Sequence, residues 1–164
     1  METKNFFLSL LNENRPDAVA VLHGNAEHPD INGIVQFYSL PESGILIAAE
    51  ITGLPENESD SPAFFAFHIH ENGDCSGSFE NTGSHYNPDN VPHPEHAGDL
   101  PPLLSNDGYV WMIFYNGYLT IPMLLNRSLI IHRDSDDFTT QPSGNAGEKI
   151  ACGVIRETKA FIQS

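Results

Sequence analysis

Residues 63–70 read AFFAFHIH and have the alternating pattern of a β-strand. Successive side chains of a strand point to opposite faces, so one face of this strand is apolar and carries Ala63, Phe65, Phe67 and Ile69. His68 and His70 lie on the opposite face, roughly 7 Å apart by the rise per residue of a strand. The pair is either half of a metal site or a chance occurrence, and the rest of the chain distinguishes the two.

The rest of the chain repeats this strand pattern. Short apolar runs separated by clusters of Gly, Pro, Asn, Asp and Ser occupy residues 17–23, 31–38, 44–52, 109–115, 118–121, 128–132 and 150–155. They predict an all-β fold, an eight-stranded Greek-key β-barrel or sandwich. Two connections, residues 71–108 and 133–149, are too long to be simple turns, and we expect a functional site to hold them in shape.

The composition predicts one globular domain that does not bind polyanions. The chain has 164 residues, with 22 acidic against 7 basic side chains and a formal net charge of −15. This charge argues against nucleic acid and an anionic membrane as partners. No apolar run reaches the length of about 18 residues that a membrane span needs. The N-terminal residues lack the pattern of a secretory signal, so we expect a cytoplasmic protein.

Metal-binding residue types are concentrated in the first long connection. Residues 83–100 read GSHYNPDNVPHPEHAGDL and contain His85, His93, His96 and Asp99. Three imidazole nitrogens and one carboxylate suit tetrahedral zinc, and a metal would order a loop that is too polar to order itself. The alternative is a solvated loop that is rich in histidine by chance.

His132 ends the apolar run 128–132 and adds a further histidine at a strand end. With the two strand histidines and one loop histidine it supplies four nitrogens, a set that suits Cu(II) or Zn(II). His23 and His28, near the first predicted turn, are interpreted as surface residues. The two cysteines, Cys75 and Cys152, are either free thiols, as is usual in the cytosol, or one bridge.

Four separated motifs, in this order, resemble the copper/zinc superoxide dismutase family: FHIHENGDC (67–75), GSHYNP (83–88), HAGDLPPL (96–103) and SGNAGEKIACGVI (143–155). The resemblance extends from about Asp17 to Ile155. It implies an eight-stranded Greek-key β-barrel with copper and zinc bridged by one histidine. It also implies dismutation of superoxide anion to O₂ and H₂O₂ by Cu(II)/Cu(I) cycling beside a structural zinc.

The resemblance assigns a role to each candidate residue by position. The implied copper ligands are His68, His70, His85 and His132, and the implied zinc ligands are His85, His93, His96 and Asp99. Asp136 would hydrogen-bond ligands of both metals. Cys75 and Cys152 would form the disulfide of the family, which is known to persist inside cells. His85 would also carry a proton, and Lys149 would guide the anion.

Three departures from the family pattern bear on the predicted activity. His93 and His96 are only three positions apart, so the zinc loop is shorter than usual, although we still expect zinc. Lys149 replaces the usual arginine; lysine keeps the charge and loses the planar donor fork, so we expect lower activity. The second connection is also short, which leaves Lys149 and Arg133 as local positive charges for an anionic substrate.

The sequence leaves a second function open, a metal-binding zinc or copper relative with weak or no dismutase activity. A purely structural sandwich would leave the histidines at family positions unexplained. Residues 1–16 are predicted to be an N-terminal extension of a domain that spans residues 17–164. The apolar side chains of this extension, which include Phe6, Phe7 and Leu8, would cap the barrel, join an interface or be disordered. The family is often dimeric, so a homodimer is also an expectation.

Overall fold

The computed structural model describes residues 9, 15–56 and 63–158. Phe6, Phe7 and Leu8 of the predicted extension lie outside the described residues, and the boundary after residue 16 stays a prediction. Within the described part of the chain, no helix is both long and apolar enough to cross a bilayer.

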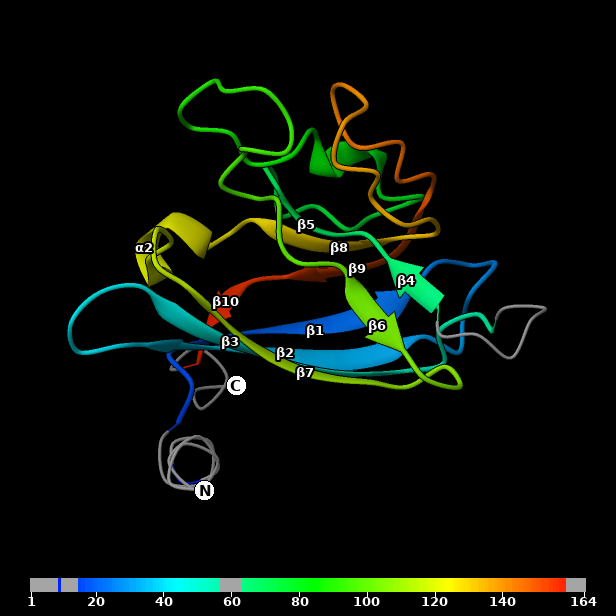
Figure 1. Ribbon diagram of the computed structural model, residues 1–164. Coiled ribbons are helices and arrows are strands. Elements are labelled where there is room, and N and C mark those ends of the chain that lie inside the picture. Colours follow the sequence, from blue (N-terminus) through cyan, green and yellow to red (C-terminus); the bar gives the residue numbers. More distant parts are fainter. Residues whose placement is uncertain (1–8, 10–14, 57–62, 159–164) are drawn as a thin grey trace.

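Antiparallel strands make up most of the regular structure, which confirms the all-β prediction (Figure 1). The larger sheet contains β1 (Ala18–Gly24), β2 (Asn32–Ser39), β3 (Ile45–Thr52), β5 (Phe67–His70), β7 (Val110–Asn116), β8 (Ser128–His132), β9 (Lys149–Val154) and β10 (Arg156–Glu157). A smaller sheet pairs β4 (Ala63–Phe65) with β6 (Leu103–Ser105). The short helices are η1 (Glu80–Thr82) and α2 (Ile121–Leu124).

The larger sheet has the strand order β5-β8-β9-β1-β2-β3-β7, and β10 pairs with β1. Strands far apart in the sequence are therefore neighbours, as in Greek-key folds. The sheet curls, so that β5, β8 and β9 lie over β1, β2, β3 and β7 (Figure 1). The main hydrophobic core fills the space between these layers and includes the fully buried Phe37, Phe65 and Phe67.

The run 63–70 keeps the predicted alternation and is divided between two sheets. Ala63, Phe65, Phe67 and Ile69 are at most 7% exposed and belong to the core. At Ala66 the chain leaves one sheet for the other, because its N–H donates to the carbonyl of Asp134 at 2.9 Å and its carbonyl accepts from His132 at 2.9 Å. The following strand, β5, pairs with β8.

Two local predictions are wrong. Residues 118–121 do not form a strand, because α2 begins at Ile121 with Pro122 in its first turn, where proline is well tolerated. Asn116 fixes the approach to this helix by accepting hydrogen bonds from the backbone of Tyr118 and Leu119, both at 2.9 Å. The connection 71–108 contains the unpredicted strand β6 and helix η1.

The two long connections meet at the same end of the molecule. In Figure 1 the green segment after β5 and the orange segment after β8 lie together at the top. Because β5 and β8 are antiparallel, the two connections start at opposite ends of the pair and fold back towards each other. They are joined by two hydrogen bonds between Gln141 and the backbone of His93, at 3.1 and 2.6 Å. Candidate residues that are more than sixty positions apart in the sequence are thereby brought close together.

Candidate metal centre

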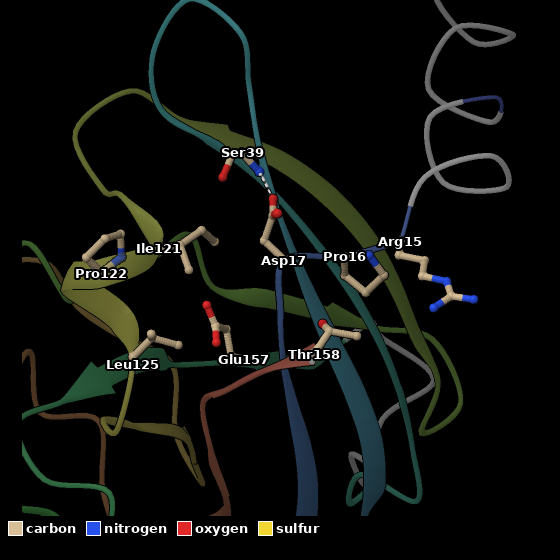
Figure 2. A pocket seen from close by; sticks show the side chains of 9 residues that line it. All are labelled: Arg15, Pro16, Asp17, Ser39, Ile121, Pro122, Leu125, Glu157 and Thr158. Atoms are coloured by element: carbon tan, nitrogen blue, oxygen red, sulfur yellow. Dashed lines mark hydrogen bonds between the residues drawn. The ribbon is translucent and has the colours of Figure 1, made fainter. Parts of the chain in front are cut away.

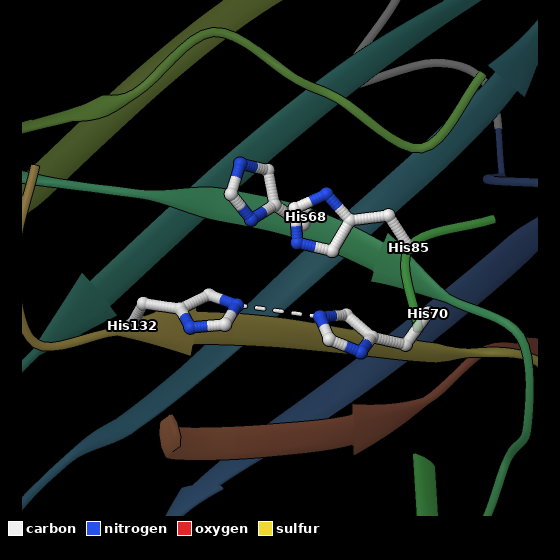
Figure 3. A group of neighbouring side chains, drawn as sticks. All are labelled: His68, His70, His85 and His132. Atoms are coloured by element: carbon white, nitrogen blue, oxygen red, sulfur yellow. Dashed lines mark hydrogen bonds between the residues drawn. The ribbon is translucent and has the colours of Figure 1, made fainter. Parts of the chain in front are cut away.

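The first group of candidate residues consists of four buried histidines. His68 and His70 come from β5, His132 ends β8, and His85 joins them from the loop through a backbone bridge to His70 (Figure 3). One nitrogen from each lies within 4.8 Å of the others. The Nε2 atoms of His70 and His132 are 3.2 Å apart. Two nitrogens on one ion at roughly 2.0–2.1 Å are separated by at most about 4.2 Å, so small shifts would complete a site.

The second group is organised by Asp99, whose carboxylate contacts the other three members. Its Oδ1 lies 2.7 Å from Nδ1 of His85. Its Oδ2 lies 3.0 Å from Nδ1 of His93 and 3.2 Å from Nδ1 of His96. All four side chains provide a ligand atom within 4.8 Å of the others. His85 is the member that both groups share.

Asp136, in the second long connection, links the two groups. Its Oδ2 is 2.8 Å from Nε2 of His68, and its Oδ1 is 2.9 Å from Nε2 of His93. Gly144 makes room for this carboxylate, because a Cβ at that position would lie 2.0 Å from Asp136 Oδ1. A hydrogen bond to one ring nitrogen fixes which nitrogen remains free for a metal.

Two backbone carbonyls orient the rings of His70 and His132, and the sequence did not indicate these partners. Nδ1 of His70 donates to the carbonyl of Gly83 at 2.9 Å, and Nδ1 of His132 donates to that of Gly147 at 3.2 Å. Both rings therefore present Nε2 to the centre of the group. No side-chain motif marks these partners, since any residue has a carbonyl oxygen.

Arg127 is a second feature that sequence reasoning missed. Its Nη1 donates to the carbonyl of Glu71 at 3.0 Å, and its guanidinium lies 3.5 Å from the centre of the Tyr86 ring. Glu71 follows His70 and Tyr86 follows His85, so this one side chain links the two segments that bring these histidines together. The one sequence feature that could have drawn attention to Arg127 is its position directly before β8.

Unsatisfied nitrogens show that the residues present fit a metal. Among the described residues, seven buried side-chain polar atoms lack a hydrogen-bond partner, and four of them are Nδ1 of His68, Nε2 of His85, Nδ1 of His93 and Nδ1 of His96. Asp99 is close to the last two atoms but is not aligned for a hydrogen bond with either. Buried polar atoms are normally paired, and leaving them unpaired destabilises a fold. Their concentration in these two groups is the pattern expected of ligand atoms.

Burial keeps His68, His70 and His132 neutral. Burial and, to a smaller extent, the neighbouring histidines lower the pKa of His68 and His70 to about 2 and that of His132 to about 4. Burial alone would raise the pKa of Asp99, but the hydrogen bond from His85 and the surrounding histidines hold it below its ordinary value. Neutral imidazoles beside a carboxylate are the protonation states that bind metals.

We expect the metal-free protein to lose stability as the pH falls below about 6.5, the ordinary pKa of histidine. The unfolded chain then binds protons at His68, His70 and His132, whereas the folded chain does not bind them until far lower pH. Each residue lowers the free energy of unfolding by up to about 1.4 kcal/mol per pH unit. Denaturant titrations of metal-free protein at several pH values between 7.5 and 5 measure this slope, and a flat profile would contradict the prediction.

Lys149 lies beside this centre, but its ammonium group is held by the opposite loop. Its Nζ donates to the carbonyl of Phe79 at 3.3 Å, the hydroxyl of Thr82 at 2.8 Å and the carbonyl of Gly83 at 3.2 Å. Burial lowers its pKa, and nearby Glu80 opposes this shift. All three ammonium protons thus have partners, and one of these is the carbonyl that orients His70.

A disulfide attaches the same loop to the same strand. Cys75 and Cys152 are bonded, with Cα atoms 5.8 Å apart, and Cys152 packs in β9 against Phe79 and Ile130. The bridge named by the family resemblance is therefore present. It holds the residues around η1 against β9 close to the point where Lys149 holds them.

A cavity of about 440 Å³ opens onto the first group, with His70, His85, His132 and Lys149 in its lining. A small solute can therefore reach the shared His85. The remaining histidines lie elsewhere: His23 is exposed, and His28 is half-buried with Nε2 at 3.5 Å from Glu148.

Comparisons with known proteins agree with this geometry. The sequence profile of the family described as copper/zinc superoxide dismutase (SODC) matches residues 31–155. The chain is 40% identical over 130 residues to superoxide dismutase [Cu-Zn] 2 of Aquifex aeolicus, covering 70% of this chain and 73% of that protein. It is 34% identical over 139 residues to the extracellular superoxide dismutase [Cu-Zn] of Rattus norvegicus, covering 79% of this chain but only 56% of that protein.

A solved structure with the same fold is that of a SOD-like protein from Bacillus subtilis. It superimposes with a TM-score of 0.72 at 30% identity, covering 83% of this chain and 96% of that chain. The sequence and the structure therefore match proteins of one family. One of these proteins, that of Bacillus subtilis, is described only as SOD-like.

Proposed function

Because the chain belongs to the copper/zinc superoxide dismutase family, we propose that it dismutes superoxide to O₂ and H₂O₂ at the centre described above. The observation that carries the proposal is the shared residue. His85 completes both a four-histidine group and a group of three histidines and one aspartate, and its Nε2 is buried without a partner.

The ligand assignment follows the two groups. His68, His70, His85 and His132 would hold copper, and His85, His93, His96 and Asp99 would hold zinc. When bound, copper would supply the one-electron redox chemistry of the reaction, and zinc would supply a fixed positive charge. Asp136 fixes the rings of one histidine from each group through its two oxygens.

His85 is the residue placed to move a proton. H₂O₂ forms from superoxide only with two protons. The His85 side chain is part of the cavity lining, and its buried Nε2 has no hydrogen-bond partner. Asp99 accepts from Nδ1 of the same ring at 2.7 Å, which orients the ring. The Asp99–His85 pair is thus arranged to hold a proton at Nε2 and release it towards the cavity.

Lys149 would act on superoxide through its charge. Its three donors are used by the loop, so it attracts the anion without a hydrogen bond of its own. Glu27, Glu80 and Glu148 line an adjacent cavity that also reaches Lys149, so this cation offsets a negative surface near the entrance. A local positive charge raises the rate at which an anion arrives.

We expect Lys149→Met to lower kcat/KM by about tenfold, because loss of a steering charge acts on the rate of encounter. The dependence of kcat/KM on ionic strength should become weaker in the same variant. Arg156→Met, which removes an equal charge from the exposed strand β10, is the matched control and should change neither quantity. An unchanged kcat/KM in Lys149→Met would remove this residue from substrate attraction.

The decisive experiment is metal analysis of the purified protein together with a superoxide dismutation assay after loading with copper and zinc. The proposal predicts about one copper and one zinc per chain and catalytic dismutation. Zinc alone, with no activity after copper is supplied, would overturn the proposal. It would support a metal-binding relative without dismutase activity, which the saturated hydrogen bonding of Lys149 also favours.

A further inference from the structure

The layer formed by β1, β2, β3 and β7 has an unusually apolar outward face, the face turned away from the core. In β1, β2, β3 and β7, one set of alternating residues enters the core and the other set faces away from it. The outward set is aligned by the strand register, with Tyr38 opposite Leu46 and Gln36 opposite Ala48. Ile113 is next to Ala48, and Tyr115 is next to Leu46. A solvent-facing side of an antiparallel sheet is normally polar.

Part of this outward face is as inaccessible as the core. Tyr38 is 3% exposed, Leu46 2% and Ala48 8%, and together with the half-buried Leu40 and Ile113 they form a cluster separate from the main core. We call these five residues the outer patch. On the same face Val19 is 8% exposed, whereas Val21, Ile34, Trp111 and Tyr115 are 42%, 39%, 55% and 57% exposed. The difference within one face points to an occupant that covers the outer patch and not the whole face.

The chain enters the sheet beside this patch. The N–H of Asp17 donates to the carbonyl of Phe37 at 2.8 Å, and the carboxylate of Asp17 accepts from the N–H of Ser39 at 2.7 Å. Figure 2 shows this second bond, with Arg15 and Pro16 next to it. Asp17 therefore lies alongside Tyr38, the residue between these two partners, and the residues before Arg15 start next to the outer patch.

We propose that the N-terminal segment Phe6–Leu11 of the same chain docks on the outer patch. This segment reads FFLSLL and is the most apolar stretch of the N-terminal residues. Five intervening residues, 12–16, reach about 17 Å when extended. Four adjacent strands span about 14 Å across, so the segment can reach every residue of the patch. Tethering at this distance gives an effective concentration in the millimolar range.

Two other arrangements are less well supported. A cavity of about 470 Å³ also lies near the chain entry (Figure 2), but Asp17, Glu157 and Arg15 are in its lining beside Ile121, and these charges disfavour an apolar segment. A second copy of the chain would be expected to cover the exposed Trp111 as well as the patch, since dimer interfaces are broad. The local segment accounts for burial that covers part of the face and leaves Trp111 and Tyr115 exposed.

Labelling of an introduced thiol tests the proposal directly. Both native cysteines are in the disulfide, so Ala48 is replaced by cysteine to give a single free thiol in the patch.

 
The variant Ala48→Cys is compared in the full-length chain with its native N-terminal segment and with the double substitution Phe7→Asp and Leu11→Asp. A matched control chain carries Thr3→Asp and Asn12→Asp, which add the same charge at polar positions on either side of the segment Phe6–Leu11.

The proposal predicts that Ala48→Cys reacts with a thiol reagent at least about tenfold more slowly with the native or control segment than with the Phe7→Asp and Leu11→Asp segment. Val21→Cys, on the same face but 42% exposed, should react at one rate in all three chains. Equal rates at position 48 in the three chains would overturn the proposal. Protection that increases with protein concentration, or protection of Pro122→Cys in the cavity instead, would also overturn it in favour of a second copy or of the cavity.

Discussion

Replacing His85 by alanine is expected to abolish dismutation and to weaken the binding of both metals. His85 is the residue common to the two groups. Its Nδ1 contacts Asp99, and the ring also belongs to the group of His68, His70 and His132. Loss of a residue that merely supports a ligand typically costs about 10–100-fold, so loss of a shared ligand should exceed about 100-fold in activity. Metal analysis after loading and the dismutation assay measure the two effects separately.

Two single substitutions show whether the effect of His85→Ala arises because His85 belongs to both groups of ligands. His132→Ala should lower copper content alone, and His96→Ala should lower zinc content alone, since each belongs to one group. His23→Ala is the control, because this exposed histidine belongs to neither. Retention of both metals and of activity in His85→Ala would rule out the shared site and the function proposed from it.

The strands could be predicted from the sequence because their signal is a simple period. Phe65, Phe67 and Ile69 alternate with polar or small residues, and the structure buries them on one face. Shorter elements lack this signal. The strand β6 has only three residues and gains its partner, β4, from a distant part of the chain. The helix α2 has four residues, too few to show a helical period, and its apolar residues resemble a strand.

The side chains of the candidate centre could be identified from their types and their order, but their arrangement could not. The spacing of residues in the sequence does not reveal that Asp99 contacts three histidines. It also does not reveal that the ammonium group of Lys149 donates three hydrogen bonds to the loop. These contacts depend on the backbone bridges of His85 and Asp99 to β5, on the pairing of β9 with β8, and on backbone carbonyls such as that of Gly83. Any residue supplies a carbonyl, so only the folded chain shows which one is used.

The strand β9 holds the loop around η1 in two ways, by the disulfide at Cys152 and by the hydrogen bonds of Lys149. The two attachments differ in kind. The disulfide also constrains the unfolded chain, whereas the hydrogen bonds of Lys149 exist only in the folded state. Removal of the disulfide should therefore act mainly on the stability of the whole domain, with Lys149 still holding Gly83 near His70.

We expect the double variant Cys75→Ala and Cys152→Ala to unfold with a free energy about 4–5 kcal/mol lower than that of the native chain, from the chain-entropy model. The bridge closes a loop between residues 77 positions apart, which makes this contribution large. Domains are stable by only about 5–15 kcal/mol in total, so the metal-free variant should be close to unfolding at 25 °C.

Denaturant unfolding of the metal-free native chain, the double variant and the native chain in reductant measures this difference. The last two should agree, because both lack the bridge and differ only in two small side chains. A loss below about 1 kcal/mol would show that the loop is already ordered in the unfolded chain or that the other contacts of β9 suffice. Metal loading should recover part of the lost stability, since ions that bind only the folded chain stabilise it by mass action.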